Sequence, residues 1–255
     1  MIEIGVDPVA FVIGSLEVRW YSIMVTAAIA MTVTWVVLLV RKEKEITYDN
    51  IITASLVAIP LGIGFARLFH VIDYWEYYGD HTTQILGLDG LSIYGGILGA
   101  SIGVFIYSRF VKIRFGYVAD MVTLILPVAQ IIGRIGCVLN GCCYGTETDI
   151  FCAITYTDPD SSAPTGVSVH PTQVYEIIFL GLVAVAIWLI RNRVKKVEGS
   201  LFLIYIAAYS LWRFIVGFFR DGQEFFLGLQ QAQVIGLAMI LIVVPVIIYR
   251  WRKNV

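Results

Sequence analysis

The chain has 255 residues, and its composition is 58% hydrophobic and only 15% charged, whereas a soluble domain is about half apolar and a quarter charged. The net charge of −1 and the lack of a basic arm argue against nucleic-acid-binding proteins, so no nucleic acid partner is expected. No cleavable signal peptide is expected either, because Glu3, Asp7 and Glu17, and not basic residues, precede the first long apolar stretch.

Long apolar runs without polar gaps follow one another along the sequence, which is typical of membrane spans. Each run can cross a hydrocarbon core of about 30 Å as a helix, the form in which backbone groups bond within their own segment. The sequence therefore predicts an all-α, polytopic membrane protein with about seven transmembrane helices, in one domain over 1–255 with a polar outer loop at 144–170. The predicted spans are 20–40, 51–72, 92–110, 117–136, 172–190, 200–219 and 231–249.

Basic residues mark one side of the membrane. Thirteen of the 18 Lys and Arg residues fall in four clusters, which follow the first, third, fifth and seventh predicted spans. By the positive-inside rule this side is cytoplasmic. The N-terminus is therefore predicted outside the cytoplasm and the C-terminus inside. The four clusters occupy 41–44, 109–114, 191–196 and 250–253.

The remaining basic residues are all arginines, and several lie at membrane depth. Arg67 and Arg213 fall inside predicted spans, and Arg134 lies near the outer end of the fourth. A charge at this depth is costly and usually faces a cavity and a partner, although Arg134 and Arg220 could instead extend from a helix end toward water. Since the planar guanidinium can donate paired hydrogen bonds to phosphate, these arginines suggest an anionic lipid headgroup.

Four of the 13 residues in the segment 133–145 are glycines, a content that breaks a helix end and lets backbone approach a ligand. Glycines that only pack against another helix are the alternative. Tyr21, Tyr94 and Tyr209 fall in the same outer half of the predicted spans. Tyr209 and Arg213, four residues apart, share a helix face, so we expect a polar site here.

This combination resembles the prolipoprotein diacylglyceryl transferase family. The segment 133–145 is similar to the signature of that family. Asp7-Pro8-Val9 leading to Trp20-Tyr21, Gly95-Gly96, and the segment from His170 to Glu176 are similar as well. The spacing from Tyr209 to Arg220 also matches, and the resemblance covers nearly the whole chain in order.

The resemblance implies an enzyme of the bacterial cytoplasmic (inner) membrane, multi-pass, with its active site toward the outer face. It would move a diacylglyceryl group from phosphatidylglycerol, a membrane lipid, to the lipobox cysteine thiol in the signal peptide of a prolipoprotein. Glycerol 1-phosphate would leave, and no cofactor is implied. Arg134 and Arg213 match functional arginines of the family and would stabilise the departing phosphate ester. The expected substrate contacts are Tyr21, Arg67, Gly95, Gly96, Asn140, Gly145 and Tyr209.

Several residues depart from the family pattern. Tyr94 stands where the family usually has a histidine proposed as the base, and a phenol with a pKa of about 10 is a poor base near neutrality. Tyr94 could still donate a hydrogen bond, and His170 is the substitute base to consider first, unless it only precedes a helix start. Cys137 and Cys142 replace the usual Asn and Glu, and Gly217 replaces a glutamate.

The four cysteines, Cys137, Cys142, Cys143 and Cys152, admit several interpretations. Cys142 or Cys143 could form a disulfide with Cys152 on an oxidising side of the membrane, or the cysteines could be small packing residues. A metal site with His170 fits no standard zinc spacing, and a covalent cysteine nucleophile would need a different mechanism. We expect no metal site.

Other functions remain open. A related membrane transferase could use another acceptor or phospholipid, as the replaced His, Asn and Glu suggest. A transporter or channel is also compatible with buried arginines and broken helices, but it predicts an inverted internal repeat that the sequence does not show. A non-catalytic lipid-binding membrane protein is the third alternative.

Overall fold

The computed structural model describes residues 2–14, 16–41, 46–87, 92–194, 197–222 and 224–254, which are mostly helical. Lys42, Lys44, Lys195 and Lys196 of the predicted basic clusters, and Leu91 before the third predicted span, lie outside the described residues. The α-helices are α1 (Trp20–Val40), α2 (Tyr48–Asp73), α3 (Trp75–Asp80), α4 (Ile93–Phe110), α5 (Phe115–Thr123), α6 (Leu126–Asn140), α7 (Thr172–Val194), α8 (Ser200–Val216) and α9 (Gln231–Asn254).

Five of the described helices are long and apolar enough to cross a membrane: α1, α2, α7, α8 and α9. The pair α5 and α6 makes a sixth candidate if the two helices, bent by 52°, form one broken span. Each of the seven predicted ranges contains a helix, and the fully described part of α4, Gly95–Phe110, is apolar but too short to count as a candidate span. The protein is therefore a polytopic membrane protein, with five or six candidate spans in the part of the chain that the structure describes.

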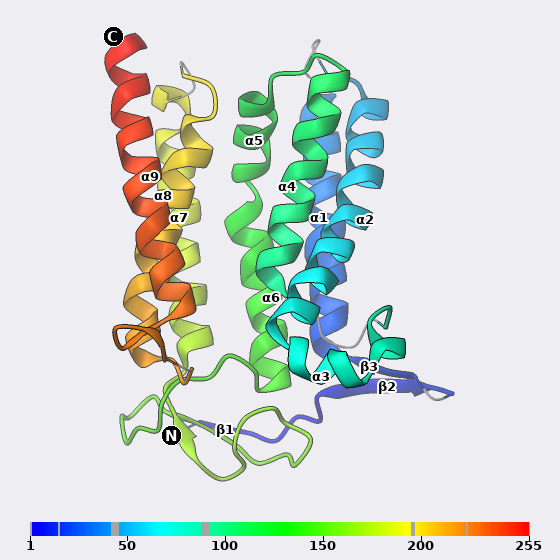
Figure 1. Cartoon of the computed structure of the whole chain (residues 1–255). Helices are drawn as coiled ribbons and strands as arrows, with labels where there is room; N and C mark the ends of the chain where they lie inside the picture. The colour runs from blue at the N-terminus through cyan, green and yellow to red at the C-terminus, as the bar shows by residue number, and fades with distance from the viewer. Residues whose placement is uncertain are drawn as a thin grey trace. The chain divides into compact units, whose positions relative to one another are not determined.

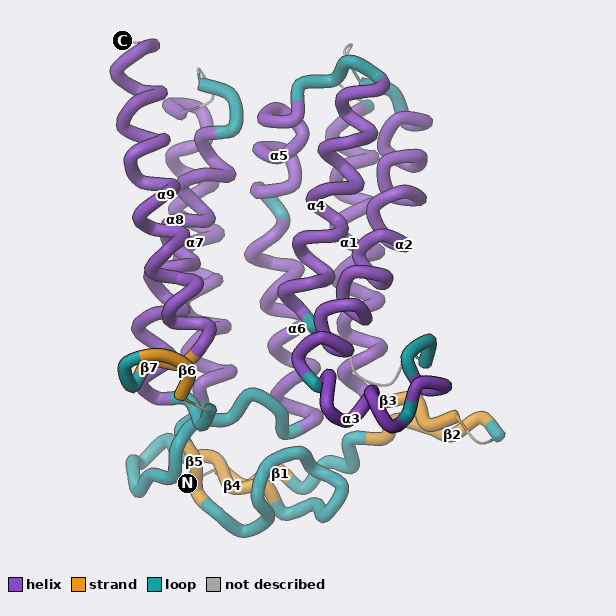
Figure 2. The backbone as a smooth tube through the Cα atoms, in the orientation of Figure 1, coloured by secondary structure: helices purple, strands orange, loops and turns teal. Residues whose placement is uncertain are grey.

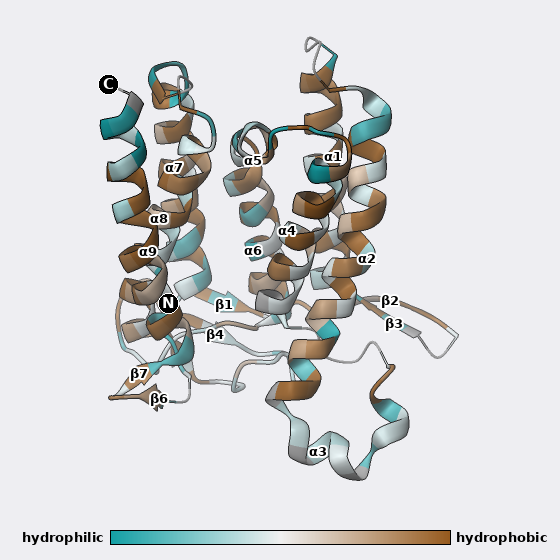
Figure 3. Cartoon of the chain, turned by 45° about the horizontal axis from the view of Figure 1, so that its top comes forward, coloured by the Kyte–Doolittle hydropathy of each residue, from teal (hydrophilic) through white to brown (hydrophobic). Residues whose placement is uncertain are grey.

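The outward faces of these helices are apolar. Leu182 and Leu189 of α7 are 67% and 74% exposed, and Leu241 of α9 is 68% exposed. Figure 3 shows hydrophobic residues along most of α9 and hydrophilic ones at its C-terminal end. Such faces are stable in lipid and would be unstable in water, as the membrane assignment requires.

The bend between α5 and α6 has a local cause. Pro127 lies in the first turn of α6, where its missing N–H costs nothing, but in a continuous helix its ring would clash with the carbonyl group of Thr123, four residues earlier. The chain therefore leaves the first helix at Thr123 and begins the second at Leu126.

The chain forms two compact units, Met1–Thr32 with Ala119–Val255, and Val33–Val118. In the second unit α2 and α4 lie side by side (Figure 1). A Cβ at Gly95 would lie 2.2 Å from the Phe65 carbonyl oxygen, and one at Gly99 would lie 2.4 Å from the Leu61 carbonyl oxygen. Glycines thus allow the two helix backbones to approach closely, as is common between membrane helices.

In the first unit α8 packs against both α7 and α9. The Asp120 carboxylate accepts hydrogen bonds from the backbone N–H groups of Gly199 and Phe202, which caps the N-terminus of α8. At the other end the buried Gln233 of α9 donates to the Phe214 carbonyl. Figure 1 shows strand β1 (Ile2–Ile4) and the C-terminal end of α9 at opposite ends of this unit.

Beyond the helices lie short strands, so the expectation of an all-α protein is correct only for the membrane part (Figure 2). Outside hydrocarbon, water can bond open strand edges, and small sheets become possible. The remaining strands are β2 (Val9–Ile13), β3 (Leu16–Arg19), β4 (Ile154–Tyr156), β5 (Ser168–Val169), β6 (Glu224–Phe226) and β7 (Leu229–Gln230).

The segment 144–170, predicted as a polar loop, is part of a small folded lobe. Strand β4 pairs in parallel with β1 and antiparallel with β5. Ile154, Tyr156, Ala163 and Val169 form a buried apolar cluster under this sheet. The C-terminal end of α6 and the start of α7 both continue directly into this lobe.

Candidate active site

A buried charge network joins α6, α7 and α8. The Arg134 guanidinium lies 2.8 Å from the Glu176 carboxylate, with side chains 12% and 2% exposed. The Tyr209 hydroxyl donates a 2.9 Å hydrogen bond to the same carboxylate oxygen. Because a buried ion pair is stable only when its remaining polar atoms are bonded, this arrangement holds the arginine fork in one position.

Aromatic and polar side chains of α8 extend this network. Tyr205 stacks on Tyr209 and donates a hydrogen bond to Gln130 of α6. Arg213 lies one turn beyond Tyr209, in the last turn of α8. Trp212 stacks on Phe179 of α7 with ring centroids 4.6 Å apart.

An open apolar groove of about 300 Å³ lies between α7 and α8. Trp212 of α8 forms one wall, and residues of α7 on both sides of Glu176 form the other: Tyr175, Ile178, Phe179 and Leu182. An apolar groove of this kind suits the hydrocarbon part of a lipid.

The glycine-rich segment shapes the end of α6. Gly141 adopts a left-handed conformation with φ of 68° and ends the helix. A Cβ at Gly136 would lie 3.2 Å from Cα of Tyr21, so α1 crosses α6 closely at this point. Tyr21 and Arg134 are thus brought to neighbouring positions on two helices.

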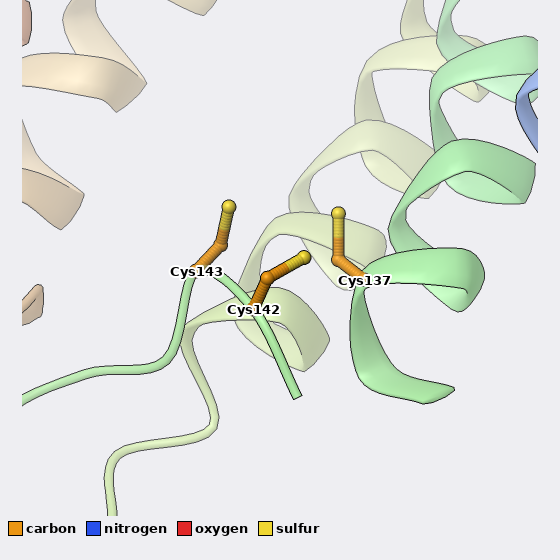
Figure 4. A group of neighbouring side chains, drawn as sticks. All are labelled: Cys137, Cys142 and Cys143. Atoms are coloured by element: carbon orange, nitrogen blue, oxygen red, sulfur yellow. The ribbon is translucent and has the colours of Figure 1, made fainter. Parts of the chain in front are cut away.

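Three of the four cysteines gather at the same place. The sulfurs of Cys137, Cys142 and Cys143 all lie within 4.8 Å of one another, and we call these residues the cysteine triad. Figure 4 shows Cys137 on the last turn of α6 and the other two on the segment that follows. A guanidinium nitrogen of Arg134 donates to the Cys137 sulfur over 3.8 Å.

The backbone of the cysteine triad is held by the first residues of α7. Thr172 donates to the Cys143 carbonyl over 2.6 Å, and Gln173 donates to the Cys142 carbonyl over 2.8 Å. These bonds hold Cys143 at a φ of 63°, which non-glycine residues seldom adopt.

The surroundings favour a negative charge on Cys143. The pKa of its thiol is lowered because its sulfur accepts hydrogen bonds from Cys137 and Cys142. The positive charges of Arg220 and Arg134 lower this pKa further. A sulfur here can therefore exist as thiolate, the form that attacks electrophiles and binds metals.

All four cysteines are free thiols, and Cys152 does not belong to the cysteine triad. The structure therefore contains no disulfide from Cys142 or Cys143 to Cys152. His170 is not part of the triad either. Its Nδ1 atom lies 3.2 Å from the Tyr175 hydroxyl, and its ring packs edge-on against Phe219.

Asn140 and Gly145 also have partners in the lobe. The Asn140 amide nitrogen donates to the Ser162 hydroxyl, while its buried oxygen has no hydrogen-bond partner among the described residues. A Cβ at Gly145 would lie 2.4 Å from both the Cβ of His170 and the Phe219 carbonyl oxygen. Close packing of three segments accounts for the glycine at this position.

Four predicted site residues lie in the other unit. Arg67 is 8% exposed and donates to the carbonyl oxygens of Ile85 and Gln84. Its guanidinium also lies 4.9 Å from the centroid of the Tyr78 ring. Gly95 and Gly96 face α2, and Tyr94 lies in the first turn of α4, with its side chain outside the described part of the chain.

Sequence reasoning did not assign Glu176, Gln130 or Gln173 to the site. Glu176 has the clearest signal in the sequence, because it is an acidic residue inside a predicted span and is therefore the natural partner of a buried arginine. Gln173 gives no such signal, since only the fold places it against the backbone of Cys142.

Comparison with known proteins agrees with the resemblance. A sequence model of the family described as prolipoprotein diacylglyceryl transferase matches residues 8–249. A phosphatidylglycerol–prolipoprotein diacylglyceryl transferase of Dehalococcoides mccartyi is 49% identical over 254 residues, which cover 100% of this chain and 97% of that protein. Proteins of the same name from Clostridioides difficile and Listeria monocytogenes are 32% and 33% identical, and the matches cover 97% of this chain and 97% and 91% of those proteins.

Proposed function

The chain belongs to the prolipoprotein diacylglyceryl transferase family, and from this membership we propose that it transfers a diacylglyceryl group from phosphatidylglycerol to prolipoproteins. The acceptor is the thiol of a lipobox cysteine, and glycerol 1-phosphate leaves. The observation that carries the proposal is the mostly buried Arg134, held by Glu176 and Tyr209 between three apolar helices.

Arg134 suits the departing phosphate. When the thiol attacks the glyceryl carbon, negative charge grows on the phosphate ester, and fixed donors stabilise it most. The contacts to Glu176 and Cys137 use one N–H of each terminal nitrogen, and the guanidinium has five N–H groups. Arg213, one turn beyond Tyr209, provides a second positive charge.

Polar side chains near Arg134 are the proposed further contacts of the lipid headgroup. The buried oxygen of Asn140 can accept a hydrogen bond from a glycerol hydroxyl, and Tyr21 can donate to a phosphate oxygen. The one O–H of Tyr209 already donates to Glu176, so contact of Tyr209 with the headgroup stays a prediction. The apolar groove between α7 and α8 suits an acyl chain. For Arg67, Gly95, Gly96 and Gly145 the observed contacts give structural roles, and contact of these four with the substrate stays a prediction.

The proposed topology has seven spans in one transferase domain. The N-terminus lies outside the cytoplasm, and the C-terminus lies inside it. α4 and the bent pair α5 and α6 complete the count. The opposite positions of β1 and the C-terminal end of α9 support an odd number of spans. The site at the outer end of α6 then faces the exterior of the cytoplasmic membrane, where secreted precursors emerge.

The proposal is tested with the purified protein in detergent, phosphatidylglycerol and a lipobox peptide. We expect the peptide to gain the mass of one diacylglyceryl group while an equal amount of glycerol phosphate is released. A peptide in which serine replaces the lipobox cysteine is the control. A folded protein that gives no product, beside an active family member in the same assay, would contradict the proposal.

A second candidate is the same transfer to a different thiol acceptor or from a different phospholipid. The cysteines at 137 and 142, in place of the usual Asn and Glu of the family, favour it. Lipidomic and proteomic comparison of cells with and without the gene would separate the two, because an alternative acceptor would carry the diacylglyceryl group while lipobox proteins would not.

A further inference from the structure

The cysteine triad has no role in the transfer described above. We propose that Cys137, Cys142 and Cys143 bind one zinc ion and that the acceptor thiol takes its fourth coordination position. The binding of zinc stands apart from the proposed function, whereas the identity of the fourth ligand rests on it.

The geometry of the cysteine triad suits zinc. Zinc binds thiolate sulfur at about 2.3 Å with tetrahedral angles, which corresponds to S···S separations of about 3.8 Å. The three sulfurs already lie within 4.8 Å of one another, so contraction by about 1 Å or less completes the site. Rotation of cysteine side chains is enough for such a shift.

Three sulfur ligands also select the ion. Thiolates favour zinc and other soft ions over magnesium and calcium, which prefer oxygen. Among the residues that the structure describes, no fourth His, Cys, Asp or Glu joins the cysteine triad. Three protein ligands and one open position are the arrangement of catalytic zinc sites, whereas structural sites have four protein ligands.

The surroundings of the cysteine triad balance its charge and fix its position. One zinc ion and three thiolates carry a net charge of −1, next to the guanidinium of Arg134, which donates to the Cys137 sulfur. Thr172 and Gln173 hold the carbonyl groups of Cys143 and Cys142. Partners of this kind around a metal site orient its ligands and stabilise the bound ion.

Zinc would also explain how the acceptor thiol is deprotonated. In this chain Tyr94 stands where the family has the histidine proposed as the base. A thiol that binds zinc loses its proton, so activation needs no basic side chain at position 94. The proton passes to water. The sulfur electron pair forms the bond to the glyceryl carbon, the bond from that carbon to the phosphate ester oxygen breaks, and glycerol 1-phosphate leaves with that pair.

No electron passes to or from the zinc ion in this step. The product is a neutral thioether, which binds zinc more weakly than a thiolate does. The lipidated peptide can therefore leave the ion and the next thiol can bind.

The first test measures the metal in the full chain, purified in detergent with a reductant. We expect one zinc ion per chain by elemental mass spectrometry. After exchange for cobalt, we expect the near-ultraviolet charge-transfer bands of cobalt thiolate and the visible bands of tetrahedral cobalt. Cys137→Asn with Cys142→Glu, which restores the usual residues of the family, should abolish both signals, whereas the matched control Cys152→Ser should retain them.

The second test adds lipobox peptide to the cobalt form. We expect the charge-transfer intensity to rise by about one third, because the number of sulfur ligands increases from three to four. A peptide with serine in place of cysteine should leave the spectrum unchanged. A spectrum that does not respond to the cysteine peptide would overturn the proposed fourth ligand.

Further outcomes separate the two proposals. A folded protein without metal, metal retained by the Cys137→Asn, Cys142→Glu variant, or a disulfide within the cysteine triad under reductant would overturn the zinc site. Full transfer activity in metal-free protein would overturn its role and leave the proposed function intact. A cobalt spectrum that responds to peptide without any transfer would support the site and contradict the proposed function.

Discussion

Arg134 and Arg67 are both mostly buried arginines on apolar helices, yet their partners differ in kind. Arg134 contacts a carboxylate on another helix and a thiol. Arg67 donates to the backbone carbonyls of Gln84 and Ile85 and lies over the Tyr78 ring. The carbonyl partners tie Arg67 to a loop, whereas the carboxylate of Glu176 holds the Arg134 guanidinium in the position that we propose for binding the phosphate. Two arginines inside apolar helices can thus have different kinds of partner, and only Arg134 is proposed to act in catalysis.

The largest expected effect is at Arg134. Arg134→Ala should slow transfer by about 10²–10³-fold, because a fixed donor to the leaving phosphate is lost. It should also lower the free energy of unfolding by about 3–5 kcal/mol, because Glu176 stays buried without its partner. Adding Glu176→Gln should restore much of the stability but none of the rate, as thermal unfolding and transfer per folded molecule would reveal. Recovery of both would assign Arg134 a structural role alone.

Arg67→Ala should lower stability while leaving the transfer rate nearly unchanged, unlike Arg134→Ala. The loss of its hydrogen bonds to the carbonyls of Gln84 and Ile85 should lower the free energy of unfolding by about 2 kcal/mol. Transfer per folded molecule should change by less than about threefold, or about 0.7 kcal/mol. Unfolding and steady-state kinetics in the same detergent provide the measurement. A large rise in KM for phosphatidylglycerol would instead make Arg67 a headgroup ligand.

Gly95 and Gly96 test whether the close packing of α4 against α2 stabilises the unit that contains Arg67. Gly95→Ala should destabilise by about 1–3 kcal/mol, because its Cβ would meet the Phe65 carbonyl oxygen at 2.2 Å. Gly96→Ala is the matched control, since the nearest atom to its Cβ lies at 3.7 Å, and it should be close to neutral. Thermal unfolding separates the two. Equal stability of both variants would refute this packing.

The smallest effect is expected at Tyr209. Tyr209→Phe removes the hydroxyl that donates to Glu176 and should cost about 1 kcal/mol in stability. If the hydroxyl serves mainly to hold the ion pair, transfer should slow by about tenfold or less. A loss as large as that of Arg134→Ala would place Tyr209 in direct contact with the reacting phosphate.

Hydropathy predicted the positions of the helices because each long apolar run must bond its own backbone in lipid. The break between Thr123 and Leu126 was missed although Pro127 follows it. Proline alone does not indicate a break, since Pro60 and Pro245 lie inside intact helices. The lobe was missed because β1 pairs with β4, far along the chain, and such pairing leaves no local pattern.

The candidate site was predictable where a charged side chain falls inside an apolar span, as at Arg134, because such a charge is costly without a partner. The cysteine triad was not, because its formation needs the left-handed turns at Gly141 and Cys143 and the hydrogen bonds from α7. Cysteine spacing in the sequence contains none of this. The sequence thus identifies polar residues that are unusual inside an apolar span, but only the fold shows which of them lie close together.

The most direct test of the account is the transfer rate of three proteins in one assay: the unchanged chain, Arg134→Ala with Glu176→Gln, and Arg67→Ala. Peptide mass and glycerol phosphate release would be followed together and normalised to folded protein. The account predicts transfer by the first and third and loss of at least about 100-fold in the second. Equal rates for the Arg134 and Arg67 variants would contradict the assignment of catalysis to the network of Arg134, Glu176 and Tyr209.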